Sequence, residues 1–163
     1  MSTLYVDNLQ PNLGSRVMAA GHVVQVVEDV VTPLFTSVTS TSHVTIASVT
    51  ITPSATSSKI ILRGEGMFYK NNNGAGSNGA AFWSIYRNGV VIPNVGFLQE
   101  NGTSHYAHYT DNTLLYIYPF SQSVTDTPNT TAAITYDFKV SSALGGAFSY
   151  YSGFKLTAME IAQ

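Results

Sequence analysis

Apolar and polar residues alternate with a period of two over residues 49–52, where Val49 and Ile51 are each followed by a threonine. This period predicts a strand with one buried face and one solvated face. Pro53 ends the pattern, because proline has no N–H to donate to a sheet, and the hydroxyl residues after it predict a turn. A second strand is predicted from Lys59. The two strands form either a β-hairpin or a corner between two sheets, with a bulge near Ala47.

The same period recurs further along the chain. Residues 134–140 show the cleanest alternation. Residues 22–31 also fit a helical stripe, but their many β-branched valines favour a strand. Asn88 and Gly89 predict a type I′ hairpin turn, since both residue types adopt positive φ readily.

Turns separate several further strands. One strand is predicted at residues 114–118, ended by Pro119, with a polar loop over residues 121–130. In total the pattern predicts eight to ten short strands and no long helix. The predicted fold class is therefore all-β, an antiparallel β-sandwich of the jelly-roll-like type, with an extended N-terminal arm.

The first residues differ from the remainder. Residues 1–21 hold Leu4, Tyr5, Val6 and Leu9 among polar residues, proline and glycine. A disordered tail is the alternative, but these side chains are too apolar for a solvated tail. We expect an arm that becomes ordered against a partner chain. The predicted domains are this attachment segment at 1–21 and a β-sandwich domain at 22–163.

Charged residues are scarce. They make up 10% of the 163 residues, whereas soluble domains typically have about 25%. This deficit predicts that part of the surface is covered by other subunits. The net charge of −2 argues against nucleic-acid binding, which needs clustered basic residues. No apolar run reaches the roughly 18 residues that span a bilayer, so membrane insertion is not expected.

Candidate metal and cofactor sites are weak. His105 and His108 are three residues apart in a predicted strand and therefore point to opposite faces. The chain has no cysteine, so we expect no metal site. Residues 74–79 match G-x-G-x-x-G, but a β segment follows where a dinucleotide site needs a helix. No cofactor is expected.

Catalytic residues are not predicted either. The sequence has no Gly-x-Ser-x-Gly motif to support a hydrolase nucleophile. Glu65, Asp137 and Glu160 are the carboxylates that a glycosidase pair would need. They are interpreted as scattered, solvated charges, and the chain is not expected to be an enzyme.

Aromatic residues suggest a binding surface. Tyr106 and Tyr109, with His105 and His108, are candidate contacts for a glycan, because flat rings with a polar tip stack on sugars. The alternative is that these residues pack in the core or at a subunit interface.

Three segments resemble virion proteins of tailed phages, in particular short tail-fibre-like proteins of marine and cyanobacterial phages. The opening STLYVDNLQ at 2–10 is similar to their S-T-L-x-V-D-x-I-Q starts. The other segments are GHVVQVV at 21–27 with ITPSATSSKI at 51–60, and LTAMEI at 156–161. The resemblance implies a β-rich, trimeric structural protein without catalysis, attached through its N-terminal segment.

The leading hypothesis is a virion structural protein of the tail fibre, the baseplate or the capsid surface. It would assemble in the host cytoplasm as a homotrimer and join other virion proteins through Leu4, Tyr5, Val6 and Leu9. The alternative is a carbohydrate-binding module that recognises a host surface glycan.

Overall fold

Strands form where β-branched and aromatic residues dominate. The computed structural model describes residues 20–31, 35–70, 79–93, 105–109, 116–142, 148–151 and 154–163. These residues contain strands and turns but no helix. The strands are β1 (Val23–Val31), β2 (Phe35–Val38), β3 (Val44–Ile51), β4 (Lys59–Lys70), β5 (Gly79–Arg87), β6 (Val90–Val91), β7 (His105–Tyr109), β8 (Tyr116–Asp126), β9 (Ile134–Ser142), β10 (Phe148–Tyr151) and β11 (Phe154–Ile161).

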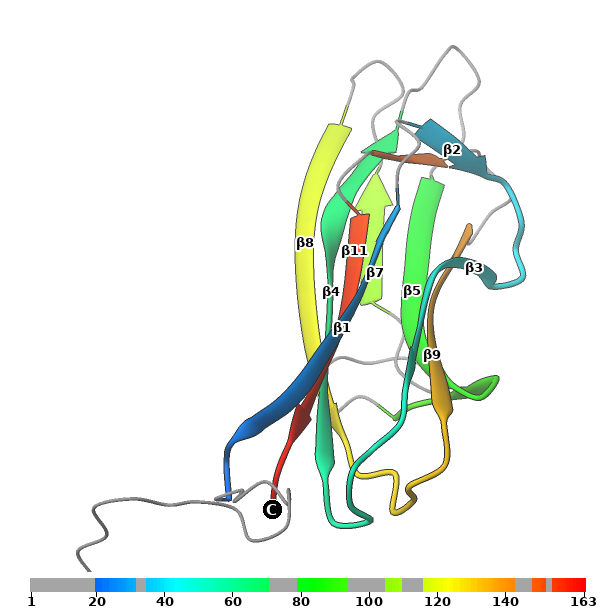
Figure 1. Ribbon diagram of the computed structural model, residues 1–163. Helices are drawn as coiled ribbons and strands as arrows, with labels where there is room; N and C mark the ends of the chain where they lie inside the picture. Colours follow the sequence, from blue (N-terminus) through cyan, green and yellow to red (C-terminus); the bar gives the residue numbers. More distant parts are fainter. Residues whose placement is uncertain are drawn as a thin grey trace, which may run out of the picture.

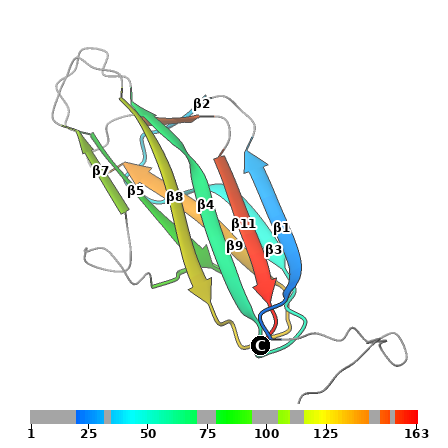
Figure 2. The same cartoon turned by 90° about the vertical axis from the view of Figure 1, so that its left-hand side faces the viewer.

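The strands form two antiparallel sheets (Figure 1). The six-stranded sheet has the order β1-β11-β4-β10-β2, and β8 pairs with the other side of β4. The five-stranded sheet has the order β3-β9-β5-β6, and β7 also pairs with β5. Figure 2 shows β8, β4, β11 and β1 side by side, with β9 and β3 of the other sheet behind them.

The strand pairs are nested along the chain. Strand β1 pairs with β11, β3 with β9, β4 with β8, and β5 with β7. The first half of the chain thus lies antiparallel to the second half, as in one long hairpin. Successive pairs alternate between the two sheets, which is the jelly-roll arrangement. The predicted all-β sandwich is confirmed.

The core lies between the two sheets and comes from the inward residues of both. Phe138 of β9 and Phe154 of β11 meet there with their ring centroids 4.6 Å apart at 60°. The other fully buried apolar side chains of the central strands are Ile51, Ile60, Leu62, Ile134, Tyr136, Val140, Leu156 and Ala158. Four of the buried side chains lie at alternate positions of β9, as the sequence pattern predicted.

The segment around Pro53 is a corner between sheets. Strand β3 ends at Ile51 in the five-stranded sheet, and β4 begins at Lys59 in the six-stranded sheet. Between the two predicted alternatives, the corner is therefore confirmed. The pairing of β3 with β9 shifts between Thr45 and Ala47, where the bulge was expected.

The predicted hairpin turn is also confirmed. Asn88 has a φ of 47° and Gly89 a φ of 82°, and β5 returns into β6 through them. The side-chain oxygen of Asn88 accepts a hydrogen bond from the backbone N–H of Thr135 at 2.9 Å. This bond fixes the turn against β9.

The predictions that Pro119 ends a strand and that residues 121–126 belong to a loop are wrong, whereas residues 127–130 lie outside any strand, as predicted. Strand β8 runs from Tyr116 to Asp126 without interruption. Among the described strands it pairs with β4 alone, so it lies at the edge of its sheet. Proline is tolerated in an edge strand, where its missing N–H need not leave a neighbour unpaired.

The interpretation of Glu160 as a solvated charge is also wrong. Its side chain is 0% exposed. Its Oε1 accepts hydrogen bonds from the backbone N–H and hydroxyl of Ser54, at 2.7 and 2.6 Å, and from the hydroxyl of Ser58 at 2.7 Å. Its Oε2 accepts from Nε2 of Gln25 at 2.6 Å. Glu160 thus fastens the corner turn to β1 and β11.

A second polar cluster links the two sheets. Nη1 of Arg87 donates to both carboxylate oxygens of Asp126, at 3.0 and 3.1 Å. The buried hydroxyl of Tyr136 donates to Oδ2 of Asp126 at 2.7 Å. Asp126 belongs to β8, whereas Arg87 and Tyr136 belong to β5 and β9. Burial, and then the Asp126 carboxylate, raise the pKa of Tyr136 far above its usual range, so its hydroxyl stays a donor.

We expect Tyr136→Phe to lower the free energy of unfolding by about 1.5 kcal/mol, the lower end for a buried hydrogen bond to a charged group, since Arg87 still pairs with Asp126. Urea unfolding at neutral pH measures this change. The control is Tyr86→Phe on the outer face of β5, where we expect a change below about 0.5 kcal/mol. Equal effects of the two substitutions would contradict the assigned role of Asp126.

The predicted domain boundary stays a prediction, because residues 1–19 lie outside the described part of the chain. At the start of the described part, the N–H of Gly21 donates to the carbonyl of Ala162 at 2.8 Å. The N–H of Ala162 donates to the carbonyl of His22 at 2.9 Å. The chain is therefore already tied to the sandwich at Gly21.

Candidate functional site

The outward residues of β1, β11, β4 and β8 line up in rows across the six-stranded sheet. Because side chains alternate along a strand, every second residue faces away from the core. In the middle row Glu28 is paired with Thr157, Thr157 with Arg63, and Arg63 with Ser123. The neighbouring rows are Val26-Met159-Ile61-Thr125 and Val30-Lys155-Glu65-Ser121.

These rows border a shallow groove of about 590 Å³ on the outer face of the sheet. We call it the outer groove. Its lining residues are Val26, Glu28, Ile61, Arg63, Glu65, Ser121, Ser123, Lys155, Thr157 and Met159. Apolar side chains occupy one end of the groove, and charged side chains occupy its middle and its other end.

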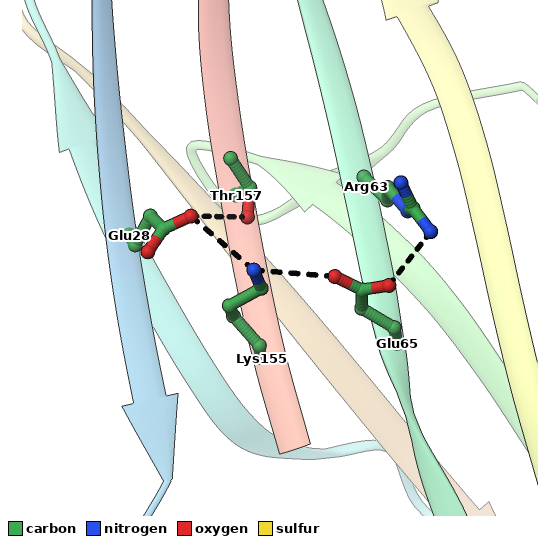
Figure 3. Close-up of polar contacts among 5 residues, drawn as sticks. All are labelled: Glu28, Arg63, Glu65, Lys155 and Thr157. Carbon is green, nitrogen blue, oxygen red and sulfur yellow. Dashed lines mark hydrogen bonds and ion pairs between the residues drawn. The ribbon is translucent and has the colours of Figure 1, made fainter. Parts of the chain in front are cut away.

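The charged side chains form one continuous network (Figure 3). Nζ of Lys155 lies 3.3 Å from Oε1 of Glu28 and 3.3 Å from Oε1 of Glu65. Nη2 of Arg63 lies 2.8 Å from Oε2 of Glu65. The hydroxyl of Thr157 donates to Oε1 of Glu28 at 3.3 Å. The network runs from β1 across β11 to β4, with negative and positive groups in alternation.

Within the network, the amine of Lys155 holds its proton firmly. Hydrogen bonds to Glu65 and then to Glu28 raise the pKa of Lys155, so its amine is a poor base. Both carboxylates already contact a cation. The arrangement is therefore suited to binding through ion pairs and hydrogen bonds and offers no free acid–base pair in this groove.

The two ends of the network are the most exposed. The side chain of Arg63 is 57% exposed and that of Glu28 is 45% exposed. Lys155 and Glu65, in the middle, are 32% and 28% exposed. Two acids and two bases make the network neutral as a whole, so a strongly charged ligand gains no net attraction from it.

None of the attachment or glycan-contact residues predicted from the sequence is among the lining residues of the outer groove. The attachment residues Leu4, Tyr5, Val6 and Leu9 lie outside the described residues. The glycan candidates His105, Tyr106, His108 and Tyr109 belong to β7, and only the backbone of this strand is described there. Tyr106 is paired with Phe82 and His105 with Trp83 of β5. Both sets of residues therefore remain predictions.

The outer groove was not predicted from the sequence. Ile61, Arg63 and Glu65 alternate with buried residues of β4, and Ser121 and Ser123 occupy the same kind of alternating position in β8. Period-two spacing could have placed these side chains on an outer face. The order of strands in the sheet, which brings the segments together, is not contained in that spacing.

Two further classes of site are missing from the described residues. They contain no group of three or more histidine, aspartate or glutamate side chains that could hold a metal ion. Nor do they contain a helix that is long and apolar enough to cross a membrane.

No family model matches the sequence, and no curated protein matches it. Solved structures do match the fold. A chain in the crystal structure of the T13 particle of infectious bursal disease virus aligns with a TM-score of 0.52 at 13% identity. The alignment covers 96% of this chain and 35% of the viral chain. The VP2 subviral particle of the same virus aligns with a TM-score of 0.47 at 14% identity, over 96% and 37% of the two chains.

The likeness to the T13 particle chain shows a shared fold over nearly all of this chain. At 13% identity it shows the fold alone, and this chain spans about a third of the length of the viral chain.

Proposed function

We propose that this chain is a non-enzymatic virion structural protein, placed in the tail fibre or baseplate or on the capsid surface. The single observation that carries the proposal is the two-sheet sandwich with nested strand pairs, which shares its fold with a chain from a viral particle over 96% of this chain. The low charge content supports it, because 10% charged residues suit a protein that covers surface with neighbouring subunits.

The proposed assembly is a homotrimer. In sedimentation at micromolar concentration, we expect a species near three times 17.5 kDa. A monomer at every concentration, with no partner present, would contradict the trimer. The particle role would then still be tested by incorporation into virions.

The proposed attachment segment is the arm at residues 1–21. Each large apolar side chain that it buries would contribute about 1.5–3 kcal/mol, against an ordering cost of about 1–2 kcal/mol per backbone residue. One arm is therefore marginal, but three arms on a symmetric platform would bind cooperatively through avidity. The hydrogen bonds of Gly21 and His22 with Ala162 lie outside residues 2–20, so removing those residues spares them.

We expect deletion of residues 2–20 to leave a folded protein that no longer joins virus particles. The thermal midpoint of the truncated protein should stay within about 4 °C of that of the full chain, a shift equivalent to at most about 1–2 kcal/mol. Incorporation is measured by the amount of protein that co-purifies with particles. If the truncated protein unfolds, the segment is needed for the sandwich itself. If incorporation is unchanged, attachment uses other residues.

The alternative function is glycan recognition, which would reside on β7. Among the described strands, β7 pairs with β5 alone and lies at an edge of the five-stranded sheet. An edge position suits contact with a large external ligand. A glycan array tests this alternative: selective binding that Tyr106→Ala or Tyr109→Ala abolishes would support it, and no binding to any glycan would reject it.

A further inference from the structure

The three rows of the outer groove have an internal symmetry. Each row crosses four strands in the order β1, β11, β4, β8, so the centre of the face lies between β11 and β4. A two-fold axis parallel to the strands at this centre would place a second copy face to face on the first. It would set β11 over β4 of the second copy, and β1 over β8.

The charged row is self-complementary under this operation. Lys155 of one copy would face Glu65 of the other, and the same contact occurs twice. The two existing ion pairs would join into a ring of four alternating charges. Arg63 would face Thr157, and no two like charges would face each other in the three rows.

Three of the remaining facing pairs match as well. Met159 would face Ile61, which places apolar on apolar surface twice. Glu28 would face Ser123, whose hydroxyl can donate to a carboxylate. Val26 would face the methyl-bearing Thr125. Val30 would face Ser121, so this pair at the edge of the contact sets an apolar side chain against a hydroxyl. Charges that match themselves are what a two-fold contact between identical subunits requires.

We infer that the outer groove is a two-fold contact between two copies of this chain, with Lys155 of each copy paired to Glu65 of the other. The occupant is a second copy because the face is neutral as a whole yet alternates in charge, and a second copy presents the matching pattern of charges. A uniformly acidic or basic partner would meet one repulsive group for each attractive one.

The contact is small. Four strands about 4.8 Å apart and three rows about 6.8 Å apart cover about 400 Å² of sheet, whereas stable complexes bury about 800 Å² per partner. We therefore expect weak pairing, with a dissociation constant of about 0.1–1 mM, that is strengthened when many copies are arrayed in one assembly. The contact is independent of the proposed trimer, because it doubles the mass of whichever species is present.

Charge reversal tests the pairing. Lys155→Glu would set a carboxylate against the carboxylate of Glu65 in the second copy, and Glu65→Lys would set two lysines together. We expect each variant alone to raise the dissociation constant of the doubling step at least tenfold in sedimentation equilibrium. In a mixture of the two variants, both contacts become opposite in charge, so the mixture should associate at least as well as the wild type.

The control is Lys139→Glu on β9, which reverses a similarly shielded lysine in the other sheet. Its dissociation constant should stay within threefold of the wild type. The inference is overturned if the wild type does not double in mass at 1 mM, if the single variants associate as well as the wild type, or if the mixture associates no better than either variant alone. If trimers form but their mass never doubles, the two-fold contact is refuted and the proposed trimer is retained.

A second measurement does not depend on charge reversal. The chain has no cysteine, and Val26 and Thr125 lie three strands apart in one copy, about 14 Å, beyond the roughly 7 Å reach of a disulfide. In the Val26→Cys/Thr125→Cys variant, any disulfide must therefore join two copies. We expect most of the oxidised protein to run as a covalent dimer, and less than a tenth for either single-cysteine variant. The inference is overturned if the double-cysteine variant forms no covalent dimer, or if the single-cysteine variants form an equal fraction of it.

Discussion

Glu160→Gln should lower the free energy of unfolding by about 2–4 kcal/mol at neutral pH, since a buried charged acceptor is lost. The glutamine keeps the shape of the side chain, but its NH₂ group is a donor. It would face either the donor Nε2 of Gln25 or the donors of Ser54 and Ser58, so that one hydrogen bond is lost. Gln25 cannot turn its amide without losing the 2.7 Å bond from Nε2 to the carbonyl of Thr52. The variant therefore loses one hydrogen bond to a charged group and weakens three others.

The pH dependence of stability follows from the same contacts. Burial tends to raise the pKa of Glu160, but the hydrogen bonds from Ser54, Ser58 and Gln25 outweigh burial and hold the pKa below its ordinary value of 4.5. A carboxylate with a lowered pKa in the folded state stabilises the fold at any pH above its unfolded value. This stabilisation is lost as the pH falls below about 4.5 and through the folded pKa.

Urea unfolding at pH 7 and at several acidic pH values measures both effects. The difference between wild type and Glu160→Gln should narrow in acid, because the wild-type carboxylate becomes neutral there. Glu28→Gln is the control, since it changes an exposed glutamate of the same sheet and should cost less than about 1 kcal/mol. A difference that stays constant from pH 7 to pH 3 would contradict the role of a charged Glu160.

Gly64→Ala should lower the free energy of unfolding by about 2–3 kcal/mol, because it overpacks the core. A Cβ atom at position 64 would lie 2.7 Å from Cε2 and 2.8 Å from Cδ2 of Phe138, too close for carbon atoms. The ring of Phe138 is fully buried and packs against Phe154, so it cannot move away without disturbing the core. Overpacking of this kind typically costs about 1–3 kcal/mol and outweighs the small gain from replacing a glycine.

Thermal unfolding of four proteins tests this packing: the wild type, Gly64→Ala, Phe138→Leu and the double variant. We expect the double variant to lose at least about 1 kcal/mol less free energy of unfolding than the two single variants lose together. The reason is that leucine at position 138 makes room for the methyl group at position 64. Additive effects would mean that Gly64 and Phe138 do not clash as the distances indicate. Ser121→Ala on the outer face of β8 is the neutral control.

Much of the fold could be predicted from the sequence, because strands with one buried face have a period of two. The alternation at 134–140 indicated the buried side of β9, and Asn88 with Gly89 indicated the hairpin. The sequence pattern predicted only the first part of β8, up to residue 118, because Pro119 is a strong strand breaker in general. Its tolerance depends on the edge position, which only the assembled sheet determines.

Fewer of the buried polar contacts, and less of the outer groove, could be predicted. Glu160 follows a pattern that a core residue would satisfy, but a carboxylate at such a position is normally solvated. Its partners Gln25, Ser54 and Ser58 are distant in the chain, so no local signal pairs them. The outer groove depends in the same way on four strands that come from separate parts of the sequence.

The proposed virion role is tested most directly by producing the protein during a virus infection and looking for it in the purified particles. Electron cryomicroscopy measures its position, and a tag after Gln163 identifies it. The proposed function requires sandwich-shaped density at symmetry-related positions on every particle, clustered in threes. Intact particles that lack this density, with the protein left entirely in the supernatant, would contradict it.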